Sequence, residues 1–447
     1  MRELIEGTEF YHQEFVRFER EVVGAEPAWI HRIRHEAFSR FTAVGFPTPH
    51  DEEWKHTDVA PLTKIPFQAA TSKPPTLPKE DLVEATFEQL LCSQLVFLNG
   101  RFSPELSAVR PLPSGVTVGS LADILKTRSG EVESHLTQYA DYQDHAFVAL
   151  NTAFMEDGAF AYVPRNTKIE EPLHLVFIST AEDRPFLSFP RNLIVLGENS
   201  QATIIESYVG IRNGCYFTNA VTELVLGNEA QVNHCTYQHE SPAAFHLMNL
   251  AVHQDRGSRI ASTSVFLGGG LARSKVHAVL KAEAIDCSLS GLYLAGGRQH
   301  VDIQTMIDHA KPGSTSRQLY KGILNDHASG VFKGRILVRE NAQKTDAAQI
   351  NQNLLLSDDA VINTTPQLEI FADDVKCKHG TSVGHLDAEA LFYLRSRGVG
   401  EEAARNLIVY GFASAITDRL EIEPLRVRLS EFLRGWLSGK PSTLEAL

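Results

Sequence analysis

The chain has 447 residues, of which 43% are hydrophobic, enough for two or three domains with full cores. Its formal net charge of -13 disfavours nucleic acid or an anionic membrane as the main partner. No apolar stretch approaches the length of a membrane span, and residues 1–7 lack the apolar segment of a secretory signal. Five scattered cysteines fit reduced thiols, so we expect a cytoplasmic protein.

The amino-terminal part predicts helices and a connecting segment. Apolar and aromatic residues recur at helical spacing over residues 8–44, with a break at Gly24 to Pro27, which predicts a helical hairpin. The cluster Glu53-Trp54-Lys55-His56-Thr57 follows, and we interpret its tryptophan as an aromatic that packs this segment onto the next domain. The proline-rich residues 71–79 predict an exposed linker.

Three more elements are expected before the centre of the chain. Residues 95–102 predict a β-hairpin with Asn99-Gly100 at its turn. Residues 118–139 read as an amphipathic helix, and residues 147–161 as another helical segment. These elements lead into a region of different character.

Residues 173–384 are a long succession of short apolar strands separated by polar turns. In four turns a small residue precedes the next strand, at positions 200, 230, 258 and 284, which are 30, 28 and 26 residues apart. A repeat of this length predicts a β-solenoid, because each coil covers the apolar face of the coil before it. The less regular spacing of Ala328, Ala342 and Ala360 leaves a two-sheet sandwich as the alternative.

Helices return after the solenoid, beginning near Asp387, Glu401 and Pro424. Such a module either caps the last coil or forms a docking surface. The sequence thus predicts three parts: a mainly helical amino-terminal domain of residues 1–165, a β core of residues 166–385, and a helical carboxy-terminal domain of residues 386–447.

The sharpest candidate site lies in the expected last strand, residues 369–380. Side chains alternate along a strand, so Cys377 and His379 would share a face with Phe371 and Asp373, while the neighbouring lysines point to solvent. Thiolate and imidazole are suitable ligands for iron, zinc or an iron–sulfur cluster. Two ligands do not complete a site, and an inert buried cysteine beside a hydrogen-bonded histidine is the alternative.

Other polar groupings have weaker claims. Gly268-Gly269-Gly270 lacks the Lys-Ser or Lys-Thr of a phosphate-binding loop, so no nucleotide site is predicted. Two other sets of residues share a strand face and could bind metal, but polar residues at such positions more often simply form an exposed strand face. These sets are Cys235, Tyr237 and His239, and His300, Asp302 and Gln304.

Three segments closely resemble the SufB/SufD family of iron–sulfur cluster assembly proteins, namely residues 300–324, 330–380 and 390–413. The similarity extends over about residues 172–420. The cluster Glu53 to Thr57 looks like the SufD branch, and Cys377-Lys378-His379-Gly380 matches the Cys-x-His-Gly pattern of that branch. SufB carries a cluster-building cysteine just before the strand that here reads 351–356, where this chain has only amides.

The resemblance implies a mainly β fold, a right-handed parallel β-helix between helical terminal domains. It also implies a non-catalytic scaffold subunit of a SufBCD complex, which pairs with SufB and binds the ATPase SufC through its carboxy-terminal helices. Such a subunit assists iron acquisition and cluster assembly at its interface with SufB. The family role carries over to Cys377 and His379, as ligands of iron or of a transient iron–sulfur cluster shared with SufB.

The open strand edge of a last coil gives this pairing a physical basis, because an unpaired edge can accept another chain. A self-sufficient, SufB-like homodimer is one alternative, against which the amides at 351–353 argue. When isolated, the chain could still pair with a second copy of itself. A β-helix enzyme acting on polysaccharides is another alternative, but it predicts a secretion signal and converging carboxylates, and the sequence shows neither.

Overall fold

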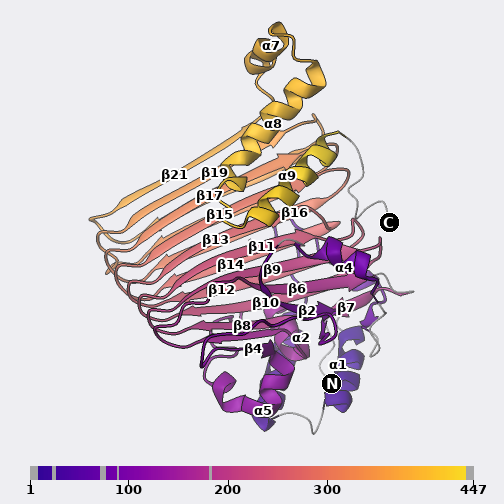
Figure 1. Cartoon of the computed structure of the whole chain (residues 1–447), viewed down its shortest axis with the longest axis vertical. Helices are drawn as coiled ribbons and strands as arrows, with labels where there is room; N and C mark the ends of the chain where they lie inside the picture. The colour runs from indigo at the N-terminus through magenta and orange to yellow at the C-terminus, as the bar shows by residue number, and fades with distance from the viewer. Residues whose placement is uncertain (1–8, 23–26, 71–76, 88–89, 181–183, 439–447) are drawn as a thin grey trace.

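The computed structural model describes residues 9–22, 27–70, 77–87, 90–180 and 184–438, and its centre is a stack of long strands (Figure 1). From Arg191 to Gly384 the chain alternates between two sheets and adds one strand to each sheet in every coil. All neighbouring strands in this stack are parallel. The structure therefore confirms the prediction of a mainly β solenoid between helical regions and excludes the sandwich.

The first sheet contains, in spatial order, β20 (Val361–Ile370), β18 (Ser329–Val338), β16 (His300–His309), β14 (Leu271–Leu280), β12 (Phe245–Gln254), β10 (Tyr216–Leu226), β8 (Arg191–Leu196), β5 (Ala159–Val163) and β4 (Thr117–Ser120). The second contains β21 (Lys376–Gly384), β19 (Asp346–Leu355), β17 (Thr315–Leu324), β15 (Asp286–Ala295), β13 (Arg259–Phe266), β11 (Gln231–His239), β9 (Gln201–Ile211), β6 (Leu173–Thr180), β2 (Ser93–Leu98) and β3 (Arg101–Phe102). Two short strands, β1 (Gln68–Ala69) and β7 (Phe186–Ser188), pair at the side of the first sheet.

The interior of the solenoid is built from rows of apolar side chains. Leu224, Val252, Ala278 and Ile307 lie in register on successive strands, 28, 26 and 29 residues apart, and all four are buried. Burying an aliphatic side chain of this size contributes roughly 1.5 to 3 kcal/mol, so each coil is stabilised by the coils on either side.

One repeat position was predicted wrongly. The sequence pattern equates Ala284 with Ser258, but the backbone N–H of Asp286 donates to the carbonyl of Ser258, so Ile285 is its true counterpart. Ala284 instead corresponds to Gly257, and both residues have positive φ, 58° and 68°. A small residue such as Ala or Gly can occupy this positive-φ position of the turn as well as the position after it. The sequence pattern therefore aligned Ala284 one residue away from its true counterpart.

Most helices of the amino-terminal region pack on the outer face of the first sheet. Helices α1 (Glu9–Val22) and α2 (Ala28–Val44) confirm the predicted hairpin. Helix α6 (Ala146–Phe154) lies between α2 and β10 and is buried along its whole length. The other helices of this region are α3 (Ala60–Lys64), α5 (Leu121–Glu133) and α4 (Lys79–Ala85), and α4 contacts β9 of the second sheet. Of the expected linker, residues 71–76 lie outside the described part of the chain.

Two expected helices are too long. Of the expected helix 118–139, residues 118–120 belong to β4 and residues 134–139 lie beyond the end of α5; of the expected helix 147–161, residues 159–161 belong to β5. These two strands pair antiparallel with each other, and β5 also pairs with β8, so sheet hydrogen bonds override the local helical pattern. The hairpin of β2 and β3 is confirmed, with Asn99 and Gly100 at positive φ. Strands β2 and β5 of the amino-terminal region pair within the two solenoid sheets. The structure therefore shows no separation of two units at residue 165, and the domain boundary there stays a prediction.

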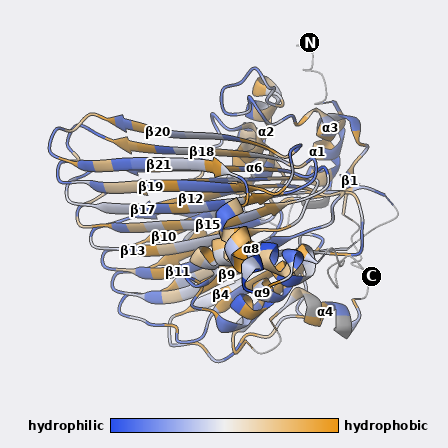
Figure 2. Ribbon diagram, turned by 90° about the horizontal axis from the view of Figure 1, so that it is seen from above, coloured by the Kyte–Doolittle hydropathy of each residue, from blue (hydrophilic) through white to orange (hydrophobic). Residues whose placement is uncertain are grey.

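Within the described residues, three helices follow the last strand: α7 (Ala388–Ser396), α8 (Glu401–Thr417) and α9 (Glu423–Leu437). The carboxylate of Asp387 accepts hydrogen bonds from the first backbone N–H groups of α7, so the expected start is confirmed. Leu425, Leu429 and Leu433 of α9 pack against the outer face of the second sheet. Helices α8 and α9 therefore lie beside the stack (Figure 2) and do not cap its last coil, while α7 projects beyond it (Figure 1).

Among the described residues, no helix is both long and apolar enough to cross a membrane.

Candidate functional site

The last coil leaves both sheets with an open edge. Strands β20 and β21 each pair with one neighbouring strand only within the described part of the chain. This end also carries exposed apolar side chains, although a soluble chain normally covers such edges with charge or another element. They are Ile350, Val361, Ile370, Phe371 and Val383. The combination is typical of an interaction surface rather than of a finished end.

Cys377 faces the interior of this last coil. It packs at the edge of a small cluster that includes Ala347 and Ala372, and it is half-buried. Burial raises the pKa of the thiol, and the nearby Asp346 carboxylate adds to this effect, while the backbone of Ala347 opposes it. The sulfur is therefore a neutral thiol in the free chain, and binding to a metal would have to release its proton.

His379 faces the same interior but is exposed. Two residues later, the hydroxyl of Thr381 lies 3.1 Å from the hydroxyl of Thr364 on the facing sheet, which shows that this row of β21 points inward. His379 lies between Thr381 and the inward-facing Cys377, and it is exposed because no further coil covers it. Over the described residues, no hydrogen bond or ion pair involves its side chain, which contradicts the alternative of a buried, hydrogen-bonded histidine.

The expected strand of residues 369–380 is in fact two strands. β20 ends at Ile370 and β21 begins at Lys376, with a turn between them. Phe371 and Asp373 therefore do not share the face of Cys377 and His379. The prediction was wrong because it continued a two-residue alternation through a turn. The prediction that Lys376 and Lys378 are exposed is confirmed.

Below β21, the side chains of Asn351 and Asn353 on β19 already have hydrogen-bond partners. Asn351 Nδ2 donates to the hydroxyl of Tyr293 at 3.1 Å, and Asn353 Nδ2 donates to Asn351 Oδ1 at 2.6 Å. Thr364 also donates to Asn351 Oδ1. These amides hold the interior of the last coils together and add no free ligand to the site.

The donor set at the open end thus consists of one sulfur and one imidazole. Both are suited to iron and iron–sulfur clusters. Within the residues that the structure describes, no group of three or more His, Cys, Asp or Glu side chains is placed to hold a metal ion. Cys377 and His379 are therefore two candidate ligands, located at an end of the solenoid where a second chain could supply others.

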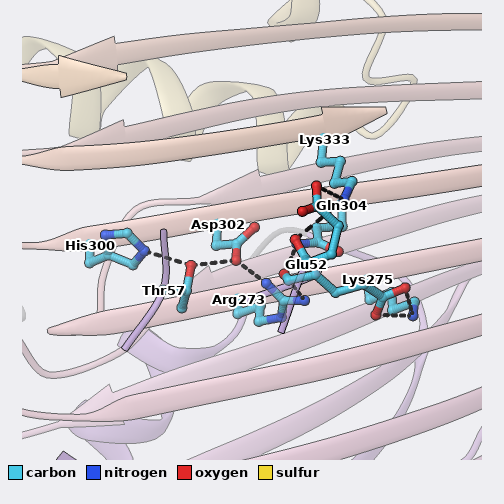
Figure 3. A network of polar contacts seen from close by, with 9 residues as sticks. Glu52, Thr57, Arg273, Lys275, His300, Asp302, Gln304 and Lys333 are labelled. Atoms are coloured by element: carbon cyan, nitrogen blue, oxygen red, sulfur yellow. Dashed lines mark hydrogen bonds and ion pairs between the residues drawn. The ribbon is translucent and has the colours of Figure 1, made fainter. Parts of the chain in front are cut away.

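We call residues 51–58 the strap. A second polar region lies beneath the strap, on the outer face of the first sheet (Figure 3). The guanidinium of Arg273 lies 3.7 Å from the ring centre of Trp54 and forms an ion pair with Asp302. Thr57 Oγ1 donates to Asp302 Oδ2 at 2.6 Å and lies 3.0 Å from His300 Nε2. The structure thus confirms that Trp54 packs this segment onto the solenoid.

The acidic residues of the strap pair with lysines of the sheet. Glu53 forms an ion pair with Lys275 at 2.8 Å, and Glu52 one with Lys333 at 3.3 Å. Gln304 Nε2 donates to the carbonyl of Glu53 at 2.7 Å. Burial lowers the pKa of Lys275, although Glu53 acts against this shift. A cavity of about 410 Å³ adjoins Glu53 and Lys275, but both of these charges are already paired. His300, Asp302 and Gln304 therefore fasten the strap and are not free to bind metal.

The third set, around Cys235, is covered by the carboxy-terminal helices. Cys235 and Tyr237 belong to the apolar cluster under α8 and α9. Burial raises the pKa of Cys235 to about 12, and the ring of His239 packs edge-on against Phe432. These side chains are part of a helix-sheet interface.

Sequence reasoning missed an exposed patch on the projecting helices. None of the residues of α7, all of which the structure describes, is buried. Phe392 is 75% exposed, and Tyr393 and Leu407 are more than half exposed. The signal was present as large apolar residues within α7 and α8, but the sequence could not show that they lie away from the solenoid. This patch is a second candidate interaction surface.

Comparison with known proteins decides the family. Residues 177–412 match the SufBD core domain of the SUF system for FeS cluster assembly, and residues 6–175 match the SufBD amino-terminal region. The chain belongs to the SufBD family. This confirms the resemblance seen in the sequence, and membership in the SufBD family supports a role in iron–sulfur cluster assembly.

Known relatives match this chain over most of its length. An iron–sulfur cluster assembly SufBD family protein of Synechocystis is 37% identical over 92% of this chain and 92% of its own length. The iron–sulfur cluster assembly protein SufD of Escherichia coli is 31% identical over 86% of this chain and 87% of its own. SufD of Bacillus subtilis is 27% identical, with coverages of 90% and 93%.

Proposed function

We propose that this chain is a non-catalytic scaffold subunit that pairs through its open solenoid end with a SufB-type subunit and contributes Cys377 and His379 to a shared iron or iron–sulfur site. The observation that carries this proposal is the inward-facing pair at the uncovered end of the last coil. A second subunit whose edge docks on β20 and β21 would cover the exposed apolar side chains and close the site at once.

The pairing surface and the donor set support each other. Edge strands bind a partner through main-chain hydrogen bonds, and apolar side chains on either side of the edge then become buried. The two protein ligands are too few to retain a metal ion by themselves, so iron or a cluster would be cargo of the assembled complex. Cluster assembly would then depend on the complex and not on this chain alone.

We further propose that the exposed patch on α7 and α8 binds the ATPase of the complex, SufC. The patch lies on the projecting α7 and the adjoining end of α8, away from the packed end of α9. Large apolar side chains exposed at the tip of a structure are typical anchors of a protein interface. An ATPase bound here would leave the open end of the solenoid free for SufB.

The first experiment tests the metal site in the complex co-expressed with SufB and SufC. His379→Ala and Cys377→Ser should leave complex assembly intact and reduce bound iron and cluster, because each substitution removes one ligand. His385→Ala and Cys215→Ser are matched controls, an exposed histidine beyond β21 and a half-buried thiol elsewhere. Full iron and cluster content in both His379→Ala and Cys377→Ser would refute the metal assignment.

The second experiment tests the ATPase surface. Phe392→Asp should abolish co-purification with SufC while SufB pairing persists, because it places a charge in the centre of the patch. Leu91→Asp, at an exposed apolar residue outside the patch, serves as the control. Point variants are preferable to truncation after Gly384, since removing α9 would also uncover the second sheet. Normal SufC binding by Phe392→Asp would exclude this surface.

A further inference from the structure

Gln349 lies directly below His379 inside the last coils. The register of β17, β19 and β21 places Gln318, Gln349 and His379 in one inward-facing row. Gln349 and Gln318 are almost fully buried, 1% and 3% exposed, whereas His379 at the end of the row is open to solvent. The row therefore leads from the closed interior to the candidate ligand.

The hydrogen bonds in this row orient the amide of Gln349. Thr305 Oγ1 donates to Gln318 Oε1 at 2.8 Å, and Gln349 Nε2 approaches the same oxygen at 3.3 Å. Gly334 on the facing sheet leaves room for this amide, since a side chain there would overlap Gln349 Nε2. The arrangement turns Gln349 Oε1 away from Gln318, and within the described residues this buried oxygen has no hydrogen-bond donor.

We propose that Gln349 is a positioning residue for His379, whose ring N–H it accepts at Oε1. Neighbouring strands are about 4.8 Å apart, so the amide of one row member can reach the imidazole of the next. The exposed His379 side chain can rotate, and a buried carbonyl oxygen without a donor is unfavourable. This inference rests on the proposed role of His379 as a ligand.

The bond would prepare His379 for metal binding. Histidines that ligate metals usually donate their other ring N–H to a carbonyl or carboxylate, which fixes the tautomer and the ring orientation. Gln349 supplies such an acceptor without adding a charge, so the second ring nitrogen is presented as a neutral donor. That nitrogen faces the open end, where the partner subunit would dock.

The test measures the tautomer of His379 in the full chain without metal. Ring nitrogens are labelled with ¹⁵N, the His379 signals are assigned by their loss in His379→Gln, and spectra are recorded where the ring is neutral. One tautomer should dominate in the wild type. Gln349→Met removes the acceptor with little change in shape, and should shift the tautomer ratio roughly fivefold, as expected for the loss of one hydrogen bond.

Two further variants make the test specific. Gln349→Glu keeps an acceptor and should preserve the preferred tautomer. Asn353→Leu changes another buried amide of β19 that lies beside Val383 rather than His379, and should not alter the ratio. An unchanged ratio in a folded Gln349→Met protein would overturn the inference. If that variant does not fold, a wild-type ratio equal to that of a free histidine peptide would overturn it equally.

The outcome separates from that of the proposed function. Loss of iron in His379→Ala together with an unchanged tautomer in Gln349→Met would leave His379 as a ligand and refute Gln349 as its positioning residue. A shifted tautomer together with full iron content in His379→Ala would show that the hydrogen bond exists and that His379 is not a ligand.

Discussion

The strap on the first sheet and the open end of the solenoid are both polar, but only one of them is complete. Under the strap, Arg273 is 3% exposed, and Asp302, Thr57 and the Trp54 ring all contact it or its partner. At the open end, His379 is exposed without a partner, within the described residues. The two regions show why ligand-like residue types alone do not identify a site.

A polar group that is fully paired stabilises a structure, whereas an unpaired one at an uncovered edge is available to a second molecule. By residue type His300, Asp302 and Gln304 could have bound metal, although an exposed polar strand face was the favoured interpretation. In the structure they fasten the amino-terminal region to the solenoid. Cys377 and His379 looked similar and are left open. The following experiments test this contrast.

The largest effect is expected from the strap. Asp302→Ala leaves the buried guanidinium of Arg273 without its counter-ion and should lower the free energy of unfolding by about 3 to 5 kcal/mol. Urea unfolding followed by circular dichroism measures the change. Glu369→Ala, which breaks the half-exposed ion pair with Arg335, is the control and should cost about 0 to 1 kcal/mol. Equal effects of the two substitutions would show that the strap network is not a buried clamp.

A charge on the open edge should act on pairing instead of folding. Val383→Lys places a lysine at an exposed position of β21 and should weaken binding to the SufB-type partner by about 2 kcal/mol or more. The free energy of unfolding of the isolated chain should change by less than about 0.5 kcal/mol. Size-exclusion chromatography of the mixed subunits measures pairing, with Leu91→Lys as the control. A strongly destabilised free chain would mean that this end is already core.

Buried His174 should make the free energy of unfolding depend on pH, which exposed His379 should not do through burial. Desolvation lowers the pKa of His174 to about 3, so this ring stays neutral in the folded chain while the unfolded chain takes up a proton near pH 6.5. Its contribution to stability is complete above pH 6.5 and is lost progressively as the pH falls toward 3. Between pH 7 and pH 5 the loss from this group is about 2 kcal/mol.

His174→Gln should remove that part of the pH dependence, as measured by urea unfolding at both pH values. Ser207→Ala removes the hydroxyl that lies 2.8 Å from His174 Nε2 but keeps the titrating ring, so it should retain the slope. The same slope in wild type and His174→Gln would contradict the assignment of a neutral buried ring.

The smallest effect is expected at the candidate ligand itself. His379→Ala should lower the free energy of unfolding by about 1 kcal/mol or less, because the exposed ring makes only the one hydrogen bond to Gln349 proposed above and water reaches this open end. Thermal unfolding of the isolated chain measures this. A loss of roughly 3 kcal/mol would instead match a buried hydrogen bond that water cannot replace, and it would place His379 with the strap residues as structure.

Some features followed from short stretches of sequence. Branched apolar runs between polar turns predicted the solenoid, Asn99-Gly100 predicted its hairpin, and Asp387 predicted the start of α7, because each depends on residues close together in the chain. The pair Cys377 and His379 was found in the same way, since two residues of one strand share a face whatever that strand packs against.

Other features depended on contacts between residues far apart in the chain. Strands β4 and β5 replaced expected helix because sheet partners supplied their hydrogen bonds, and Ala284 moved in register because its turn needed positive φ. The row from Gln318 through Gln349 to His379 joins residues about one coil apart in the chain, so a short stretch of sequence does not reveal it. Whether a polar side chain is paired or open was likewise decided only when the coils stacked, because stacking determines which groups water can reach.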